Sequence, residues 1–91
     1  MTEGQIYLRN VRGLPCLLAW TRKCLGRVHA HHAGVGCMSR KAPDDTAVPL
    51  CAQHHADWHA ASGHFSKLNQ AQRRSWAEIA IETTRRQLTP F

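Results

Sequence analysis

The chain has 91 residues, enough for one domain, but so short a chain buries a small core and often needs a metal ion or a disulfide for stability. Twelve lysines and arginines against six acidic residues give a formal charge of +6, which favours a polyanionic partner, nucleic acid first. No stretch reaches the length of a membrane span and the N-terminus lacks the pattern of a secretory signal, so we expect a soluble, cytoplasmic protein with no membrane partner.

Short extended segments are predicted in the first half of the chain. Residues 5–11 alternate enough to be a short strand or an ordered arm. Residues 27–32 and 47–50 have the pattern of two further extended segments on either side of a polar loop, and Pro49 suits an edge position. We therefore predict a β-hairpin formed by the segments at 27–32 and 47–50.

Two helices are predicted to follow the hairpin. Residues 51–62 are rich in alanine and stop at Gly63, and glycine commonly ends helices. A longer helix is expected over about 69–88, with Trp58 and Trp76 joining the two helices in the core. One face of the longer helix should carry Trp76, Ile79, Ala80 and Thr83 or Thr84, with Arg73, Arg74, Arg85 and Arg86 at its edges.

Four cysteines and seven histidines make metal binding the simplest use of this composition. A reducing cytoplasm favours thiolate ligands over a disulfide framework. Cys51 and His54 lie one turn apart at the start of a helix, and Cys16 and Cys24 can complete a Cys3His site for a structural Zn²⁺ from the preceding loop. Cys37 is expected to be a free thiol, or to replace His54 if the ligand register differs, which would free His54 for a second metal.

A second group of potential ligands consists only of histidines. His55 and His59 are four residues apart, so they lie on one helix face and can reach one metal ion together with the pair His31-His32. At about 100° per residue, this face lies roughly a quarter turn from that of Cys51 and His54, so one helix can serve two metals. His29 shares a strand face with His31 and is either a further ligand or, as we favour, an exposed or core histidine.

The order of these features resembles that of a known family. The runs HAHHAGVG, KAPDDTAVPLC and HHADWH, in the part of the chain between about Leu14 and His59, resemble the HNH endonucleases. Three features look most like small phage-borne recombination nucleases of the YbcO-like and Ref-like branches. They are the wide spacing of Cys16 and Cys24, the Ala30-His31 ending of the first strand, and the Lys-x-x-Asp loop at 41–44. The resemblance implies one α+β nuclease domain over residues 1–91, with a zinc-stabilised ββα-metal core at about 14–63 and an additional C-terminal helix.

The resemblance also implies an activity and roles for the ligand groups. It implies hydrolysis of DNA phosphodiester bonds, in phage recombination or DNA processing, with a divalent ion (Mg²⁺, Mn²⁺ or Zn²⁺) that neutralises charge on the phosphate. His31, His55 and His59 match the ligands of this catalytic ion, and His32 matches the general base that takes a proton from the attacking water. The structural zinc ligands of the zinc-containing members match Cys16, Cys24, Cys51 and His54.

Two positions depart from the family pattern. Asp44-Asp45-Thr46 stands where many members carry the middle asparagine of the motif, so the residue that orients the base is left open. In YbcO-like chains an apolar residue follows the Ala-His ending, which would align His31 rather than His32 with the base.

Basic residues supply the expected contacts to DNA. Arg40 or Lys41, on the loop between the two strands, would hold a neighbouring phosphate. Arg73 and Arg74 would either contact DNA phosphates or form a solvated helix face. Trp20 lies in the segment between Cys16 and Cys24, called here the cysteine loop, and is expected to pack over the zinc, with base stacking as the alternative. So small a chain can also act as a homodimer that cuts both strands.

Two other classes of function compete with the nuclease hypothesis. The first is a zinc-finger-like nucleic-acid-binding module without catalysis, which would leave His31, His32, His55 and His59 without a role. The second is a small zinc-dependent interaction protein, favoured only if the basic residues are dispersed over the surface. The second histidine group therefore favours the enzyme.

Overall fold

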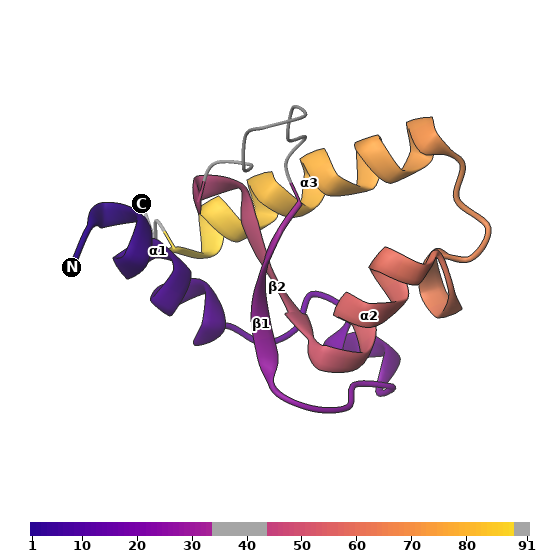
Figure 1. The fold of residues 1–91 in the computed structure, drawn as a ribbon, viewed down its shortest axis with the longest axis horizontal. Coiled ribbons are helices and arrows are strands. Elements are labelled where there is room, and N and C mark those ends of the chain that lie inside the picture. Colours follow the sequence, from indigo (N-terminus) through magenta and orange to yellow (C-terminus); the bar gives the residue numbers. More distant parts are fainter. Residues whose placement is uncertain (34–43, 89–91) are drawn as a thin grey trace.

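The computed structural model describes residues 1–33 and 44–88 and folds them as a small α+β structure around a two-stranded antiparallel sheet (Figure 1). Cys37, Arg40 and Lys41 lie outside the described residues. Among the helices of the described part, none is long and apolar enough to cross a membrane. The elements are α1 (Glu3–Arg12), η1 (Ala19–Thr21), β1 (Val28–His32), η2 (Asp44–Thr46), β2 (Ala47–Cys51), α2 (Ala52–Ala60), η3 (Gly63–Phe65) and α3 (Gln70–Leu88), where η denotes a short 3-10 helix.

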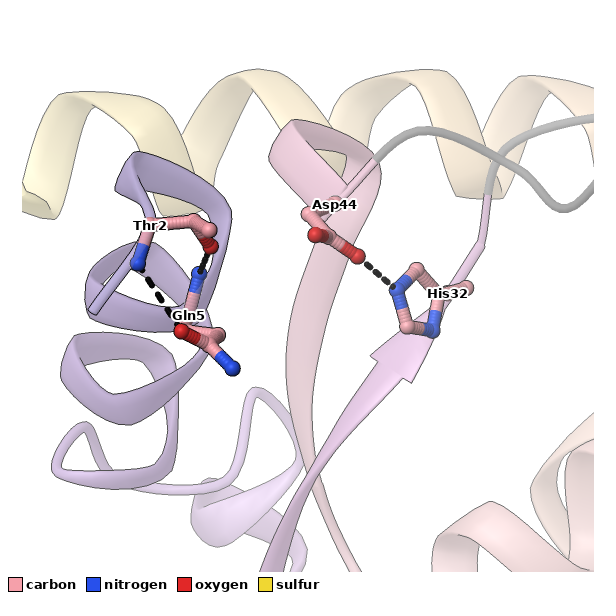
Figure 2. A network of polar contacts seen from close by, with 4 residues as sticks. All are labelled: Thr2, Gln5, His32 and Asp44. Atoms are coloured by element: carbon pink, nitrogen blue, oxygen red, sulfur yellow. Dashed lines mark hydrogen bonds and ion pairs between the residues drawn. The ribbon is translucent and has the colours of Figure 1, made fainter.

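The first element is a helix, so the prediction of a strand or an ordered arm at residues 5–11 is wrong. A capping box begins α1: the Thr2 hydroxyl accepts the Gln5 N–H at 3.1 Å, and the Gln5 side-chain oxygen accepts the Thr2 N–H at 2.8 Å (Figure 2). Tyr7, Leu8 and Val11 lie on one side of this helix, and Val11 is fully buried. The helical period of these apolar residues, rather than their partial alternation, decides the structure.

The predicted β-hairpin is confirmed. β1 and β2 pair antiparallel, with His31 opposite Val48 and Ala30 opposite Pro49. All five residues of β2 are buried, whereas burial varies along β1. Side chains alternate between the two faces of a strand, so His29 and His31 share one face of β1 and His32 lies on the other.

Two helices follow the hairpin, as predicted, with small shifts at their ends. α2 ends at Ala60, two residues before the predicted end, because Ala61 adopts a left-handed conformation (φ 51°) and closes the last turn. α3 begins within one residue of the predicted start. It contacts β2 and η2, and Figure 1 shows it crossing the hairpin, with its first half on the side of α2.

An aromatic cluster joins α2 to α3. The Phe65 ring lies 5.0 Å from that of Trp58 and 4.9 Å from that of Trp76, and Phe65 is fully buried. Trp58 and Trp76 therefore take the predicted place between the helices. Ile79, which the sequence places near the same helix face as Trp76 and Ala80, is 67% exposed. The buried positions of α3 are Ala77, Ala80 and Thr84, a stripe at spacings of three and four residues that rotates Ile79 toward solvent.

Candidate metal centres

The first candidate centre lies at the junction of β2 and α2. Cys51 is the N-cap of α2, and its Sγ accepts the backbone N–H of His54 at 3.4 Å. This cap places the two side chains one turn apart, with Cys51 Sγ 3.2 Å from His54 Nδ1. Cys16 Sγ and Cys24 Sγ each lie 3.6 Å from the same nitrogen. The structure thus brings together all four residues that the sequence assigns to structural zinc.

Backbone contacts hold the two distant cysteines in place. Leu17 N–H donates to the Pro49 carbonyl at 2.9 Å, which fixes the Cys16 segment against β2. Gln53 N–H donates to the Leu25 carbonyl at 3.1 Å, so the residues after Cys24 cover the start of α2. Gly26 permits this approach: its φ is +85°, and a Cβ there would lie 2.7 Å from the Ala52 Cβ.

The spacing of the donor atoms fits tetrahedral zinc. Bonds of about 2.3 Å to sulfur and about 2.0 Å to nitrogen place tetrahedral sulfur and nitrogen ligands about 3.5 Å apart. The observed sulfur–nitrogen distances of 3.6, 3.6 and 3.2 Å are close to this value. The described cysteines are free thiols, not disulfides. Three sulfurs and one imidazole nitrogen are also the donor set that Zn²⁺ prefers.

The ionisation of the thiols points the same way. Burial, together with the neighbouring thiols of Cys16 and Cys51, raises the pKa of Cys24 to about 12. Burial also acts to raise the pKa of Cys51, but backbone hydrogen bonds from His54 and Leu25 and the neighbouring thiols of Cys24 and Cys16 together lower it. Burial and neighbouring thiols thus oppose ionisation of Cys24, and a bound cation would favour its thiolate form.

The second candidate centre lies between β1 and α2. One nitrogen from each of His31, His55 and His59 lies within 4.8 Å of the others. The Nε2 atoms of His55 and His59 are 3.1 Å apart, close to the separation of about 3.3 Å for two tetrahedral nitrogen ligands of zinc. His31 is 97% buried by solvent accessibility, and within the described structure its Nε2 has no hydrogen-bond partner. A buried polar atom without a partner calls for an explanation, and the three histidines could hold a metal ion.

Two imidazoles of this cluster, those of His31 and His55, favour their neutral forms. Burial, together with the neighbouring His55 and His59, lowers the pKa of His31 to about 3. Burial likewise lowers the pKa of His55, with His59 and His29 adding to the shift. Neutral imidazole is the form that binds metal ions, so His31 and His55 present lone pairs at neutral pH.

Two histidines stand beside the cluster without joining it. His29 is exposed, and its Nδ1 lies 3.0 Å from the Nδ1 of His55. His32 is half-buried at the end of β1, and its Nε2 lies 2.9 Å from Asp44 Oδ1 (Figure 2). Because a carboxylate can only accept, the His32 Nε2–H is the donor, and Nδ1 is left without a proton in the neutral ring.

The turn η2 carries Asp44 and is fixed from two sides. On one side, Arg85 of α3 donates from Nε to the Asp45 carbonyl at 3.1 Å, and its Nη2 pairs with the Asp45 carboxylate at 3.2 Å. On the other side, Gly4 of α1 leaves room for Asp44, since a Cβ at Gly4 would overlap the Asp44 carboxylate. The two aspartates therefore take different directions, Asp44 toward His32 and Asp45 toward α3.

The two arginines near the histidine cluster, Arg73 and Arg74, differ in how firmly their side chains are held. Arg73 lies with its guanidinium carbon 4.0 Å from the Trp58 ring centroid and donates from Nη2 to the Trp58 carbonyl at 2.8 Å. Arg74 is exposed, and both arginines line a cavity of about 390 Å³ beside Trp58 and Ala33. Since the Trp58 ring also contacts the His31 ring, at 5.7 Å between centroids, this cavity lies next to the cluster.

Some predicted roles do not fit the observed positions. Trp20 is 73% exposed and stacks edge-on with His64 at 5.9 Å, so the prediction that it packs over the zinc site is wrong. The roles of Cys37, Arg40 and Lys41 fall outside the described residues. The sequence did not identify the residue that orients the expected general base, nor the contact of His29 with His55. The spacing of His29 and His31 on one strand face was the available signal for that contact.

Comparisons of the chain with protein-family models, with curated proteins and with solved structures found no match.

Proposed function

We propose that the protein is a metal-dependent DNA endonuclease with a ββα-metal core of the HNH type. The observation that carries the proposal is the cluster of His31, His55 and His59, one nitrogen from each lying within 4.8 Å of the others, together with a buried His31 Nε2 that lacks a hydrogen-bond partner in the described structure. A hairpin that supplies one ligand and a helix that supplies two is the arrangement that the HNH resemblance implies. The neighbouring His32–Asp44 pair adds a group that can move a proton.

The two consecutive histidines of β1 differ in ways that favour His31 as ligand and His32 as base. His31 is buried and points at the two helix histidines, where an attacking water has little access. His32 keeps 36% of its side chain exposed and has one nitrogen bonded to a carboxylate. A general base needs access to water and a fixed tautomer, and His32 meets both requirements.

The chemistry of the proposed site follows from these positions. A divalent ion held by His31, His55 and His59 would supply positive charge against the phosphate and the leaving oxygen. The His32 Nε2–H donates to Asp44, so its Nδ1 can accept the proton of the attacking water. The Asp44 carboxylate then stabilises the imidazolium that forms. Asp44 thus takes the orienting role that the sequence left open.

The substrate class rests on charge. The chain carries a formal charge of +6, and the cavity lined by Arg73 and Arg74 lies beside the histidine cluster. Arg74 is exposed and can contact a phosphate, whereas Arg73 is held against Trp58 and shapes the cavity wall. We assign Arg40 and Lys41 the same function on sequence grounds alone.

The Cys16/Cys24/Cys51/His54 centre has a structural role in this proposal. All four ligand positions are occupied by protein side chains, as in closed structural zinc sites, and three of the four residues are buried. The centre also ties the cysteine loop to the start of α2, which carries His55 and His59. Loss of its zinc would therefore disturb the histidine cluster as well.

A nicking assay tests the proposal. Supercoiled plasmid is incubated with protein that holds one zinc per chain, and Mg²⁺, Mn²⁺ or Zn²⁺ is added separately. We expect nicking with at least one added ion and none in its absence, with His59→Ala losing both metal binding and nicking. His31→Ala should lose metal binding; if it keeps metal binding and loses only cleavage, His31 is the base. Metal-independent DNA binding without cleavage under every condition would favour the zinc-finger-like binding module instead.

A further inference from the structure

The exposed histidine of β1 that contacts the cluster has no role in the chemistry above. His29 follows the strand alternation, so it lies on the same face as His31 and points to α2. Its ring meets that of His55 edge-on, at 5.2 Å between centroids and an interplanar angle of 82°. The two Nδ1 atoms are 3.0 Å apart, a hydrogen-bond distance.

The two nitrogens of His55 face different neighbours. Its Nε2 lies 3.1 Å from the His59 Nε2, on the side of the proposed ion. Its Nδ1 lies against His29. A neutral imidazole carries one proton, and its position decides which nitrogen offers a lone pair. A proton on Nδ1, donated to His29, leaves the Nε2 lone pair for the metal.

We infer that His29 is a positioning residue that accepts the Nδ1–H of His55 and thereby fixes the tautomer and ring orientation in which His55 binds metal. This inference rests on the metal centre of the proposed function. Ligating histidines usually donate their second ring N–H to an outer partner, and the loss of that partner weakens metal binding. An imidazole takes this place here, and its own proton sits on Nε2.

His29 is distinct from the ligands themselves. The three-histidine cluster, with its nitrogens within 4.8 Å of one another, does not include His29. His29 is exposed, whereas His31 is buried and His55 is half-buried. The Nδ1 that faces the cluster is occupied by the contact with His55. His29 therefore acts on the metal through His55.

The test measures metal binding rather than cleavage. Protein with zinc in the cysteine site is titrated with Co²⁺, whose visible spectrum distinguishes nitrogen ligands from thiolate ligands. We expect His29→Leu to weaken Co²⁺ binding by about tenfold to a hundredfold, and His29→Asn to recover part of the affinity because its side-chain oxygen can accept the His55 N–H. His64→Leu removes an exposed histidine outside the cluster and should bind Co²⁺ as the parent does.

Ring ¹⁵N spectra of the zinc-saturated protein give a second readout. We expect the His55 Nδ1–H to be protected from exchange with solvent in the parent and to exchange rapidly in His29→Leu. Unchanged Co²⁺ affinity in His29→Leu would overturn the inference. So would a metal-induced shift on a His29 nitrogen, which would make His29 a ligand.

Failure of the inference is separable from failure of the proposed function. His59→Ala should abolish Co²⁺ binding at the histidine cluster; if it binds as the parent does, the metal centre fails and the role of His29 fails with it. If the parent binds Co²⁺ through the cluster and His29→Leu weakens binding, the inference holds even if no DNA is cut.

Discussion

Replacing Cys51 by serine separates its two roles at the start of α2, as a proposed zinc ligand and as the helix N-cap. Its sulfur lies 3.2 Å from His54 Nδ1, among the zinc ligands, and it also accepts the His54 backbone N–H as the N-cap. Serine is a good N-cap residue but lacks the thiolate that zinc prefers. Cys51→Ser should therefore keep the cap and lose the metal, whereas Cys51→Ala should lose both.

The size of the effect follows from linkage between binding and folding. An ion that binds only the folded chain adds about 4.1 kcal/mol when its free concentration is a thousand times its dissociation constant. If the missing thiolate weakens zinc binding by about a thousandfold, the free energy of unfolding falls by about 4 kcal/mol at that zinc concentration. A small domain has about 5–15 kcal/mol in total. Cys51→Ala should cost about 1 kcal/mol more through the lost cap.

The assay is urea unfolding, followed by circular dichroism, at several buffered zinc concentrations. The unfolding midpoint of the parent should rise with free zinc, and that of Cys51→Ser should stay constant over the same range. Cys37→Ser is the matched control, because the sequence predicts a free thiol there. If Cys51→Ser holds one zinc with the parental affinity, the assignment of the site is refuted.

Three further predictions concern the base, the cluster and the DNA contact. Asp44→Ala should lower the nicking rate by about tenfold to a hundredfold with zinc content unchanged, because the His32 tautomer is no longer held, and the exposed Glu82→Ala should nick as the parent does. The pKa of His31 is about 3 in the folded chain, against 6.5 in the unfolded chain, so the unfolded chain binds more protons between these pH values. The free energy of unfolding should therefore fall as pH drops from 6.5, by at most about 1.4 kcal/mol per pH unit from this group. In urea unfolding below pH 6.5, His31→Leu should make the free energy of unfolding less dependent on pH, and an unchanged pH dependence would contradict the shift. DNA affinity should fall with salt, and Arg74→Glu should flatten the plot of log affinity against log salt; a slope equal to that of the parent would place Arg74 away from the phosphates.

The parts of the fold that sequence predicts well depend on local spacing. The i, i+3 and i, i+4 separations of Cys51, His54, His55 and His59 fix their relative directions once the helix is assigned. The alternation around His31 likewise fixes the hairpin face. Residues within one helix or strand therefore find their partners by geometry that the sequence already contains.

Two local sequence patterns compete in the segment that forms α1. The apolar residues at 6, 7, 8 and 11 fit a strand in part, but Thr2 and Gln5 form a capping box that only a helix uses. Tyr7 and Val11, four residues apart, also match the helical period. The Thr-x-x-Gln pattern was available in the sequence and would have corrected the prediction.

Other features depend on tertiary packing and could not be derived from local patterns. Asp44 meets His32 across a twelve-residue separation, and the choice of Asp44 over Asp45 depends on where Arg85 and Gly4 lie. The exposure of Trp20 depends on the path of the cysteine loop rather than on its spacing.

The most direct test of the nuclease proposal is the nicking rate of His32→Ala at saturating divalent metal. His32 is half-buried and contacts Asp44, so its removal should leave the fold, the zinc content and Co²⁺ binding at the histidine cluster intact. We predict a loss of about a hundredfold or more in rate, the magnitude expected for a missing general base. Parental nicking by His32→Ala, in a preparation free of contaminating nuclease, would contradict the proposed role of His32 and the mechanism built on it.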